Sequence, residues 1–246
     1  MTPAGRSRSP STPLSAHYFI SDAHLGAAPP ESEARLARFL AGLEGRTDTL
    51  WVLGDLFDFW FEYGRAIPKH GFRVLAALGR LRQSGTAVTC LAGNHDLRFT
   101  GFFREQLGVE TAVEARVELD GRRVLMRHGD EVDHRHLSRL FRILMRSRLN
   151  NALYGLIHPD LGIALAGWVT RRSRRRPPDA TLADRMREHG RVCLREGNDI
   201  VILGHLHRPE LTRLPEGVYL NTGDWLKNFS YGVMRDGEIA LERFAG

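Results

Sequence analysis

Short apolar runs recur along the N-terminal part of the chain, and each run stops at a glycine or a small polar loop. They cover residues 17–20, 50–53 and 86–91. A continuous apolar run of this length is typical of a strand that is buried on both faces of a sheet. The pattern therefore predicts three buried strands, whose carboxyl ends are the usual place for ligands in an open α/β sheet.

The segments between these runs have helical spacing instead. In residues 32–44, apolar side chains recur three, four and seven positions apart, and residues 72–81 repeat this pattern before Ser84-Gly85 closes it. Strands that alternate with helices indicate βαβ units, hence parallel strands joined by right-handed crossovers. We therefore expect a βαβαβ core in this part of the chain.

The pattern changes in the second half of the chain. Residues 115–119 and 122–127 flank Asp120-Gly121, a pair that favours a two-residue hairpin turn. Residues 200–203 form one more buried run, and residues 211–244 alternate short strand-like runs with turns. Together these patterns predict an α/β fold, a sandwich of two sheets flanked by helices.

The composition is that of one ordinary folded domain. The chain has 246 residues, of which 42% are hydrophobic and 26% charged, so it has the material for a single large core. Residues 1–16 are rich in Ser, Pro and Arg without an apolar stretch. We therefore expect a disordered N-terminal tail that is not a secretory signal, followed by one domain over residues 17–246. Cys90 and Cys193 lack the spacing of a disulfide framework or a zinc site, which favours a reducing, cytoplasmic compartment.

The basic charge is concentrated in one segment. The net charge is +6, and residues 134–176 contain ten arginines but a single acidic residue, Asp160. The same segment carries helical apolar stripes, which Pro159 interrupts, so we expect an inserted helical cap at about residues 134–178. Two interpretations stay open. The segment provides either extra core helices or a lid whose apolar groove and arginines meet an anionic membrane surface.

Five of the predicted strands end in side chains that bind metals in other proteins. The strand-end motifs are Asp22-x-His24, Gly54-Asp55-x-x-Asp58, Gly93-Asn94-His95-Asp96, His128-Gly129-Asp130 and Gly204-His205-x-His207. Taken alone, Gly54-Asp55 is also typical of an ordinary turn, but five such ends are hard to explain by chance. Imidazole, carboxylate and amide ligands together suit Mn, Fe or Zn better than Mg or Ca. We therefore expect two divalent metal ions that share one carboxylate.

This order of motifs resembles that of the calcineurin-like metallophosphoesterases, from Ile20 to about Trp225. The resemblance implies the β-sandwich fold of that family and a metal-dependent hydrolase. Carried over motif by motif, it assigns Asp22, His24, Asp55 and His207 to one metal ion and Asp55, Asn94, His128 and His205 to the other. His95 is similar to the family histidine that contacts the phosphate or protonates the leaving oxygen, with Asp58 as its orienting carboxylate and Asn94 as its neighbour in the catalytic motif.

Three further features resemble one branch of the family, the UDP-2,3-diacylglucosamine pyrophosphatases of lipid A biosynthesis (LpxH). They are the start FISDAHLG, the long insertion after HGDEVD, and the close LGHLHRP followed by NTGDW. This resemblance implies hydrolysis of a lipid-linked sugar nucleotide, UDP-2,3-diacylglucosamine, at its α-phosphate, to UMP and 2,3-diacylglucosamine 1-phosphate, commonly with manganese. It also implies that the inserted helices accept acyl chains and that the enzyme is peripherally associated with the inner membrane.

The third motif departs from that branch, many of whose members carry Arg at the position of His95. A soluble metal-dependent phosphodiesterase of the same superfamily, acting on a different nucleotide or on nucleic acid, therefore stays open as the alternative. The sequence contains no basic and aromatic stacking platform, so a nucleic-acid partner is not expected. A non-catalytic binding module would have lost metal ligands, and none is missing from the motifs.

Overall fold

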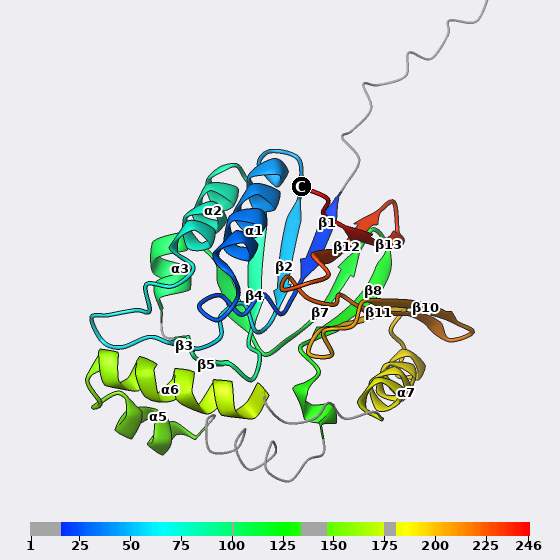
Figure 1. Ribbon diagram of the computed structural model, residues 1–246. Helices are drawn as coiled ribbons and strands as arrows, with labels where there is room; N and C mark the ends of the chain where they lie inside the picture. Colours follow the sequence, from blue (N-terminus) through cyan, green and yellow to red (C-terminus); the bar gives the residue numbers. More distant parts are fainter. Residues whose placement is uncertain (1–15, 100, 134–146, 175–180) are drawn as a thin grey trace, which may run out of the picture.

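The computed structural model describes residues 16–99, 101–133, 147–174 and 181–246, and it is a sandwich of two β-sheets with helices on its outer faces (Figure 1). The tail up to residue 15, the first part of the predicted cap (134–146) and residues 175–180 lie outside the described residues. Ala16, which we assigned to the tail, is buried, and its backbone N–H donates to Asp48. The packed chain therefore includes at least one residue more than the predicted domain.

The first sheet contains the predicted βαβαβ core. Its strand order is β13-β12-β1-β2-β4-β6, in which β1, β2, β4 and β6 are parallel. The strands are β1 (His17–Ile20), β2 (Thr49–Leu53), β4 (Ala87–Leu91), β6 (Glu110–Ala112), β12 (Ser230–Arg235) and β13 (Glu238–Arg243). The third strand begins one residue later than predicted, because the backbone N–H of Thr86 donates to the carbonyl of Leu81 and so closes the preceding helix.

Three helices cover the outer face of this sheet (Figure 1). They are α1 (Pro30–Leu43), α2 (Phe72–Gln83) and the short α3 (Phe102–Leu107). The apolar stripes predicted for the first two point inward, where Leu36, Leu40 and Leu78 are fully buried in one cluster with Val52 and Cys90 of the sheet. The helical spacing in the sequence therefore identified the face that packs.

The second sheet has the order β10-β11-β9-β8-β7. Its strands are β7 (Glu114–Leu119), β8 (Arg122–Arg127), β9 (Ile200–Leu203), β10 (Glu210–Leu214) and β11 (Gly217–Asn221), and helix α7 (Leu182–Arg195) packs on its outer face. The predicted hairpin between β7 and β8 is confirmed. Its turn residues Asp120 and Gly121 have φ of 46° and 72°, the two positive values that a type I′ turn requires.

The two sheets meet in a shared apolar layer. Phe19, Leu53 and Leu91 of the first sheet are buried in one cluster with Met126 and Ile202 of the second. The strands β1, β2, β4, β8 and β9 all end at one edge of this sandwich, and the loops that follow them carry the five predicted motifs. Parallel pairing therefore places all the candidate ligands on the same side of the molecule.

Short elements complete that edge. The strands β3 (Trp60–Phe61) and β5 (Asp96–Arg98) pair with each other, and η1 (Asp130–Val132) is a single 3₁₀ turn after β8. Strands of two or three residues are too short for periodicity to reveal them, so they were not predicted. They hold the loops after β2 and β4 together beside the candidate ligands.

Helices α5 (Arg148–Tyr154) and α6 (Pro159–Arg174) run across the same edge, below β3 and β5 in Figure 1. Pro159 was expected to interrupt the helical pattern, and it does so as the first residue of α6, a position that proline suits. The ring of Tyr154 packs against Phe59 of the loop after β2 and against Phe61 of β3, with ring centroids 5.7 and 4.9 Å apart. These aromatic contacts fix the helix pair next to the candidate site.

Candidate metal centre

Backbone strain marks the loops at this edge. Eight non-glycine residues in the described chain have positive φ, and five of them are predicted metal ligands: Asp22 (55°), His24 (44°), Asp55 (51°), His205 (65°) and His207 (55°). Such a conformation costs about 1–3 kcal/mol at each residue, and proteins retain it mainly at functional sites. Because most of these conformations occur at the predicted ligands, the loops at this edge are candidates for a functional site.

Asp22, His24 and His207 form the first donor group. His207 Nε2 lies 3.3 Å from Asp22 Oδ1 and 3.2 Å from His24 Nε2. The other oxygen of Asp22, Oδ2, accepts hydrogen bonds from the Ser21 hydroxyl and from the backbone N–H of His205. Among the described residues, Asp22 Oδ1 has no hydrogen-bond partner although it is buried. The protein thus holds one carboxylate oxygen in place and leaves the other facing the two imidazoles.

Asp55, Asn94, His128 and His205 form the second donor group around His128 Nε2. This nitrogen lies 3.3 Å from Asp55 Oδ2, from Asn94 Oδ1 and from His205 Nδ1. The opposite nitrogen of the His128 ring, Nδ1, lies 2.8 Å from the carbonyl oxygen of Leu53. Because a carbonyl only accepts, Nδ1 carries the proton, and Nε2 of the neutral ring is free to bind a metal.

Asp55 joins the two groups. Its Oδ2 lies 3.3 Å from His128 Nε2 in the second group and 3.8 Å from His24 Nε2 in the first. Its other oxygen, Oδ1, accepts a hydrogen bond from the backbone N–H of His95 at 2.9 Å. One oxygen of Asp55 therefore lies between the two groups, in the position that the shared ligand of two ions would occupy.

Two glycines make room for Asp55. A Cβ on Gly54 would lie 2.6 Å from His128 Nδ1, and a Cβ on Gly93 would overlap the Asp55 carboxylate. Gly54 also has a φ of 87°, which residues with a side chain rarely adopt. The glycine in each of these two motifs is therefore required by the close approach of two loops.

Burial and neighbouring charges determine the ionisation of these groups. Burial alone would raise the pKa of Asp55, but the His128 and His95 imidazoles hold this pKa well below its usual range. Burial, helped by His128, lowers the pKa of His205 to about 4, and burial also lowers the pKa of His24. The pKa of His128 is raised, against the effect of burial, by the charge of Asp55. In the absence of a metal ion, this raised pKa favours a second proton on the His128 ring, at Nε2. A metal ion beside Asp55 would take the place of that proton.

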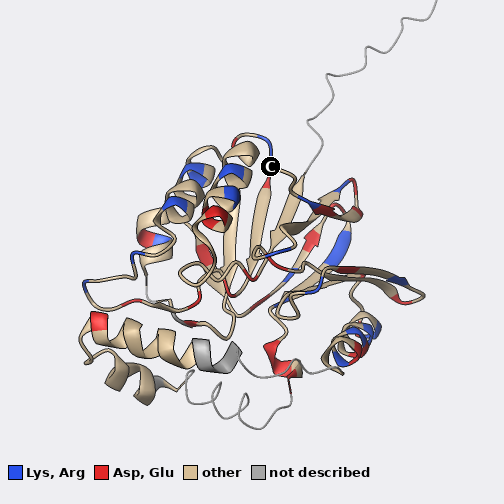
Figure 2. Cartoon of the chain, viewed as in Figure 1, with Lys and Arg blue, Asp and Glu red and all other residues tan. Residues whose placement is uncertain are grey.

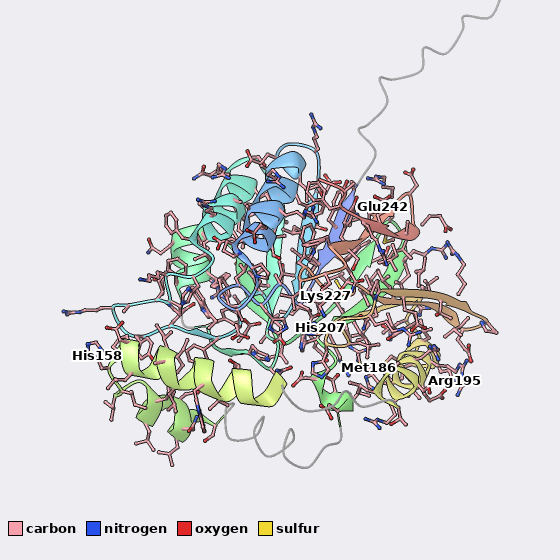
Figure 3. All side chains as sticks on the ribbon, in the orientation of Figure 1. His158, Met186, Arg195, His207, Lys227 and Glu242 are labelled. Carbon is pink, nitrogen blue, oxygen red and sulfur yellow. The ribbon has the colours of Figure 1, made fainter. Side chains whose placement is uncertain are left out.

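The donor set fits two divalent ions. Neighbouring donor atoms lie 3.2–3.8 Å apart, and ligands about 2.0–2.2 Å from a shared ion lie about 3–3.5 Å from one another. Imidazoles, carboxylates and one amide are ligands that suit Mn, Fe or Zn. Figure 3 shows His207 near the centre of the molecule, between the sandwich and the end of α6.

His95 lies beside the donor groups and next to both the carbonyl and the carboxylate of Asp58. His95 Nδ1 donates to the backbone carbonyl of Asp58 at 2.6 Å, whereas the Asp58 carboxylate oxygen Oδ1 is 3.8 Å away. The same Oδ1 is 3.7 Å from His24 Nδ1. The carbonyl of Asp58 is thus closer to His95 Nδ1 than its carboxylate is. The carboxylate of Asp58 therefore lies between the imidazoles of His24 and His95.

Sequence reasoning missed two residues that support the site. Asp96 Oδ2 accepts hydrogen bonds from the backbone N–H groups of Asp55 (2.8 Å) and Gly93 (3.1 Å), and burial, with the charge of Asp55, raises the pKa of Asp96 to about 7. Thr170 of α6 donates to Asp58 Oδ2 at 3.0 Å. Asp96 could have been identified from the sequence, because it lies within the third motif. Thr170 could not, because it is distant from Asp58 in sequence and belongs to none of the motifs.

Comparison with known proteins identifies the family. The chain matches the model of the calcineurin-like phosphoesterases over residues 18–209. It is 31% identical to a UDP-2,3-diacylglucosamine hydrolase of Porphyromonas gingivalis, over 92% of this chain and 96% of that protein. It is also 31% identical to a protein of the same name from Aeromonas hydrophila, over 92% and 98% of the two chains.

The solved structures agree with this at the level of the fold. An archaeal phosphodiesterase superposes with a TM-score of 0.50 at 14% identity, covering 92% of this chain and 98% of that one. The family match includes each of the seven predicted metal ligands. The chain thus belongs to the calcineurin-like phosphoesterase family, metal-dependent hydrolases with a dimetal centre.

Proposed function

We propose that the protein is a UDP-2,3-diacylglucosamine pyrophosphatase of lipid A biosynthesis. It would hydrolyse the lipid-linked sugar nucleotide at its α-phosphate and release UMP and 2,3-diacylglucosamine 1-phosphate. The names of its relatives support this substrate. The structural observation that carries the proposal is a row of exposed apolar side chains on α5, on α6 and in the turn between them, where α6 reaches the site through Thr170 and Asp58. A substrate with two acyl chains and a diphosphate needs both features in one place.

We define this apolar row by its large side chains, which are 47–83% exposed. Its members are Leu149, Leu153, Leu156, Leu161, Leu165 and Trp168. Figure 2 shows that α5 and α6 carry almost no charge where their side chains are described, apart from Asp160 at the start of α6. Leu161, Leu165 and Trp168 are spaced four and three residues apart and so share one face of α6. An exposed apolar face of this kind marks a contact with lipid or with a partner. Each methylene of an acyl chain buried against them would contribute about 0.8 kcal/mol.

The apolar row would also bring the protein to a membrane surface. Among the described residues, no helix is both long and apolar enough to cross a bilayer. The proposed contact is peripheral and includes the ten arginines of residues 134–176, since a basic residue near an anionic surface is worth about 1 kcal/mol. We propose the cytoplasmic face of the inner membrane as the place of this contact.

The residues of the site have separate roles in the proposed reaction. The two donor groups would hold two divalent ions, for which we propose manganese, and these ions would activate a water molecule and neutralise charge on the diphosphate. Asp22 and Asp55 are the only carboxylates among the seven proposed ligands, so the loaded site would stay positive towards an anionic substrate. His95 has Nδ1 occupied by the Asp58 carbonyl. Its Nε2 is therefore the atom that would bind the phosphate or protonate the leaving oxygen.

The direct test is to incubate the purified protein with MnCl₂ and UDP-2,3-diacylglucosamine in detergent micelles and to measure UMP by chromatography. We expect UMP release that requires manganese. Bis(4-nitrophenyl) phosphate serves as a small substrate in parallel. Turnover of the small ester without UMP release would contradict the proposal and favour a phosphodiesterase with another substrate, an alternative that His95 supports because many of the lipid enzymes carry Arg at its position.

A further inference from the structure

The hydroxyl of Thr170 points from α6 to the carboxylate of Asp58, which lies beside His24 of the first donor group. Thr170 is 8% exposed, and its Oγ1 lies 3.0 Å from Asp58 Oδ2 and 3.2 Å from the carbonyl oxygen of Gly167 in the preceding turn. A hydroxyl has one proton to donate, and an ionised carboxylate only accepts. The charged acceptor forms the stronger hydrogen bond, so the proton of Thr170 is directed to Asp58.

Asp58 uses its two carboxylate oxygens for different neighbours. Oδ2 accepts from Thr170, while Oδ1 lies 3.7 Å from His24 Nδ1 and 3.8 Å from His95 Nδ1. The opposite nitrogen of the His24 ring, Nε2, belongs to the first donor group. A carboxylate behind a metal-binding histidine fixes the tautomer and the orientation of its ring. A hydrogen bond that holds Oδ2 therefore also determines where Oδ1 points.

The loop that carries Asp58 also fixes the position of the helix that carries Thr170. Tyr63, five residues after Asp58, lies so close to Gly162 of α6 that a Cβ there would overlap the Tyr63 hydroxyl. Tyr154 of α5 packs on Phe61 of β3, in the same stretch of chain, and donates a hydrogen bond to the Gly162 carbonyl at 2.5 Å. The position of α6, and with it the position of Thr170, is therefore linked to the loop after β2 by contacts that do not involve Asp58 itself.

We propose that Thr170 is a positioning residue, which couples the α5–α6 helix pair to metal binding by holding the Asp58 carboxylate behind His24. The inference rests on the assignment of His24 as a metal ligand in the proposed function. Without the hydroxyl, Asp58 Oδ2 loses its anchor and the carboxylate rotates more freely. His24 then loses its orienting neighbour, and metal binding at the first donor group weakens.

The test uses two substitutions and a readout other than turnover. Thr170→Val removes the hydroxyl at nearly constant volume, and Thr170→Ser keeps the hydroxyl but loses the methyl group. Metal-free protein is titrated with MnCl₂ by calorimetry. We expect Thr170→Val to weaken one of two manganese sites about 10-fold or more, as for other residues behind metal ligands, and Thr170→Ser to retain the wild-type affinity. Thr170→Ala provides the same comparison if the valine variant does not fold.

Two controls separate positioning from general loosening of the helix pair. Tyr154→Phe removes the Tyr154–Gly162 hydrogen bond but keeps the ring packed on Phe61 and leaves the Thr170–Asp58 hydrogen bond in place, so manganese affinity should change far less than in Thr170→Val. In an Asp58→Ala background, Thr170→Val should have no further effect, because residues that act through one network are not additive. Equal affinity of wild type and Thr170→Val, or an equal loss in Tyr154→Phe, would overturn the inference. Failure of the wild-type protein to bind manganese would overturn the metal assignment instead.

Discussion

Asp55 Oδ2 and His128 Nε2 lie 3.3 Å apart, and His128 already uses its other ring nitrogen on the carbonyl of Leu53. A carboxylate oxygen and an imidazole nitrogen at this distance need a proton or a metal ion between them. Donor atoms of Asn94 and His205 surround the same nitrogen at 3.3 Å. The atoms of Asp55, Asn94, His128 and His205 thus form a set of four donors, which favours a metal ion over a single proton. Because Asp55 also faces the first donor group, both halves of the site depend on it.

Asp55→Asn should abolish activity and lower metal content at both donor groups. The amide has nearly the shape of the carboxylate but lacks the negative charge that a shared ligand supplies to two ions. Metal content is measured by mass spectrometry after dialysis against manganese, and activity with bis(4-nitrophenyl) phosphate. Asp236→Asn, at an exposed turn far along the chain, is the matched control and should change neither quantity. Full metal content in Asp55→Asn would exclude the bridging role.

Gly93→Ala should disturb the same carboxylate by contact. The added methyl group would overlap Asp55, so either the side chain or the loop must move. We expect a loss of about 1–3 kcal/mol in the free energy of unfolding, the usual range for overpacking, together with reduced metal content. Urea denaturation and metal analysis measure both effects.

The matched control for Gly93→Ala is Gly42→Ala in α1. The added methyl group would meet no neighbouring atom within 4 Å there, and alanine is the better helix former by up to about 1 kcal/mol. The stability of Gly42→Ala should therefore equal or exceed that of the wild type. If the two alanine variants had the same stability and metal content, the close approach of the loops at Asp55 would have no energetic consequence.

Replacing Leu149, Leu153 and Leu156 together by glutamine should slow the hydrolysis of the lipid substrate at least about 10-fold, because each large side chain contributes about 1.5–3 kcal/mol when it is buried against an apolar partner. Hydrolysis of bis(4-nitrophenyl) phosphate should not change, since these side chains are 57–83% exposed. UMP release and 4-nitrophenol release measure the two activities. The control replaces Phe72 and Val113, two exposed apolar residues outside α5 and α6, by glutamine. It should change neither UMP release nor 4-nitrophenol release. Equal loss of both activities in a folded protein would assign these three leucines a structural role.

Asp199→Asn should make the stability of the protein less dependent on pH. Hydrogen bonds from the Arg123 side chain and backbone lower the pKa of Asp199 to about 2 in the folded protein, from 3.8. A lowered folded-state pKa stabilises above pH 3.8, and this contribution is lost as the pH falls towards 2. The pair is exposed, so we expect wild type to exceed the variant by at most about 1 kcal/mol at pH 7.

Urea denaturation at pH 7, 4 and 3 measures this dependence. The difference between wild type and Asp199→Asn should be full at pH 7 and clearly smaller at pH 3. A difference that stays constant across this range would show that the ion pair with Arg123 does not contribute to stability through its charge.

Local patterns in the sequence were sufficient for most of the main elements, although helix α7 was not among those predicted. Buried runs of four to six residues identified β1, β2, β4 and β9, and the Asp120-Gly121 pair identified a hairpin whose two positive φ values are now observed. The short elements β3, β5 and α3 were missed, because they are formed by contacts of the loops and not by a period of their own. Glu62 is an example: its carboxylate accepts the backbone N–H groups of Gly101 and Phe102 at the start of α3.

The candidate ligands could be named from the sequence because each lies directly after a strand, and parallel strands bring their carboxyl ends to one edge. How these side chains meet could not be read in the same way. Which oxygen of Asp55 faces both donor groups, why Asp58 offers its carbonyl to His95 and its carboxylate to two imidazoles, and how Thr170 reaches Asp58 all depend on the packing of distant loops. The motif order thus contained the chemistry of the site, whereas the three-dimensional approach of the loops at Gly54 and Gly93, and of α6 to Asp58, set its geometry.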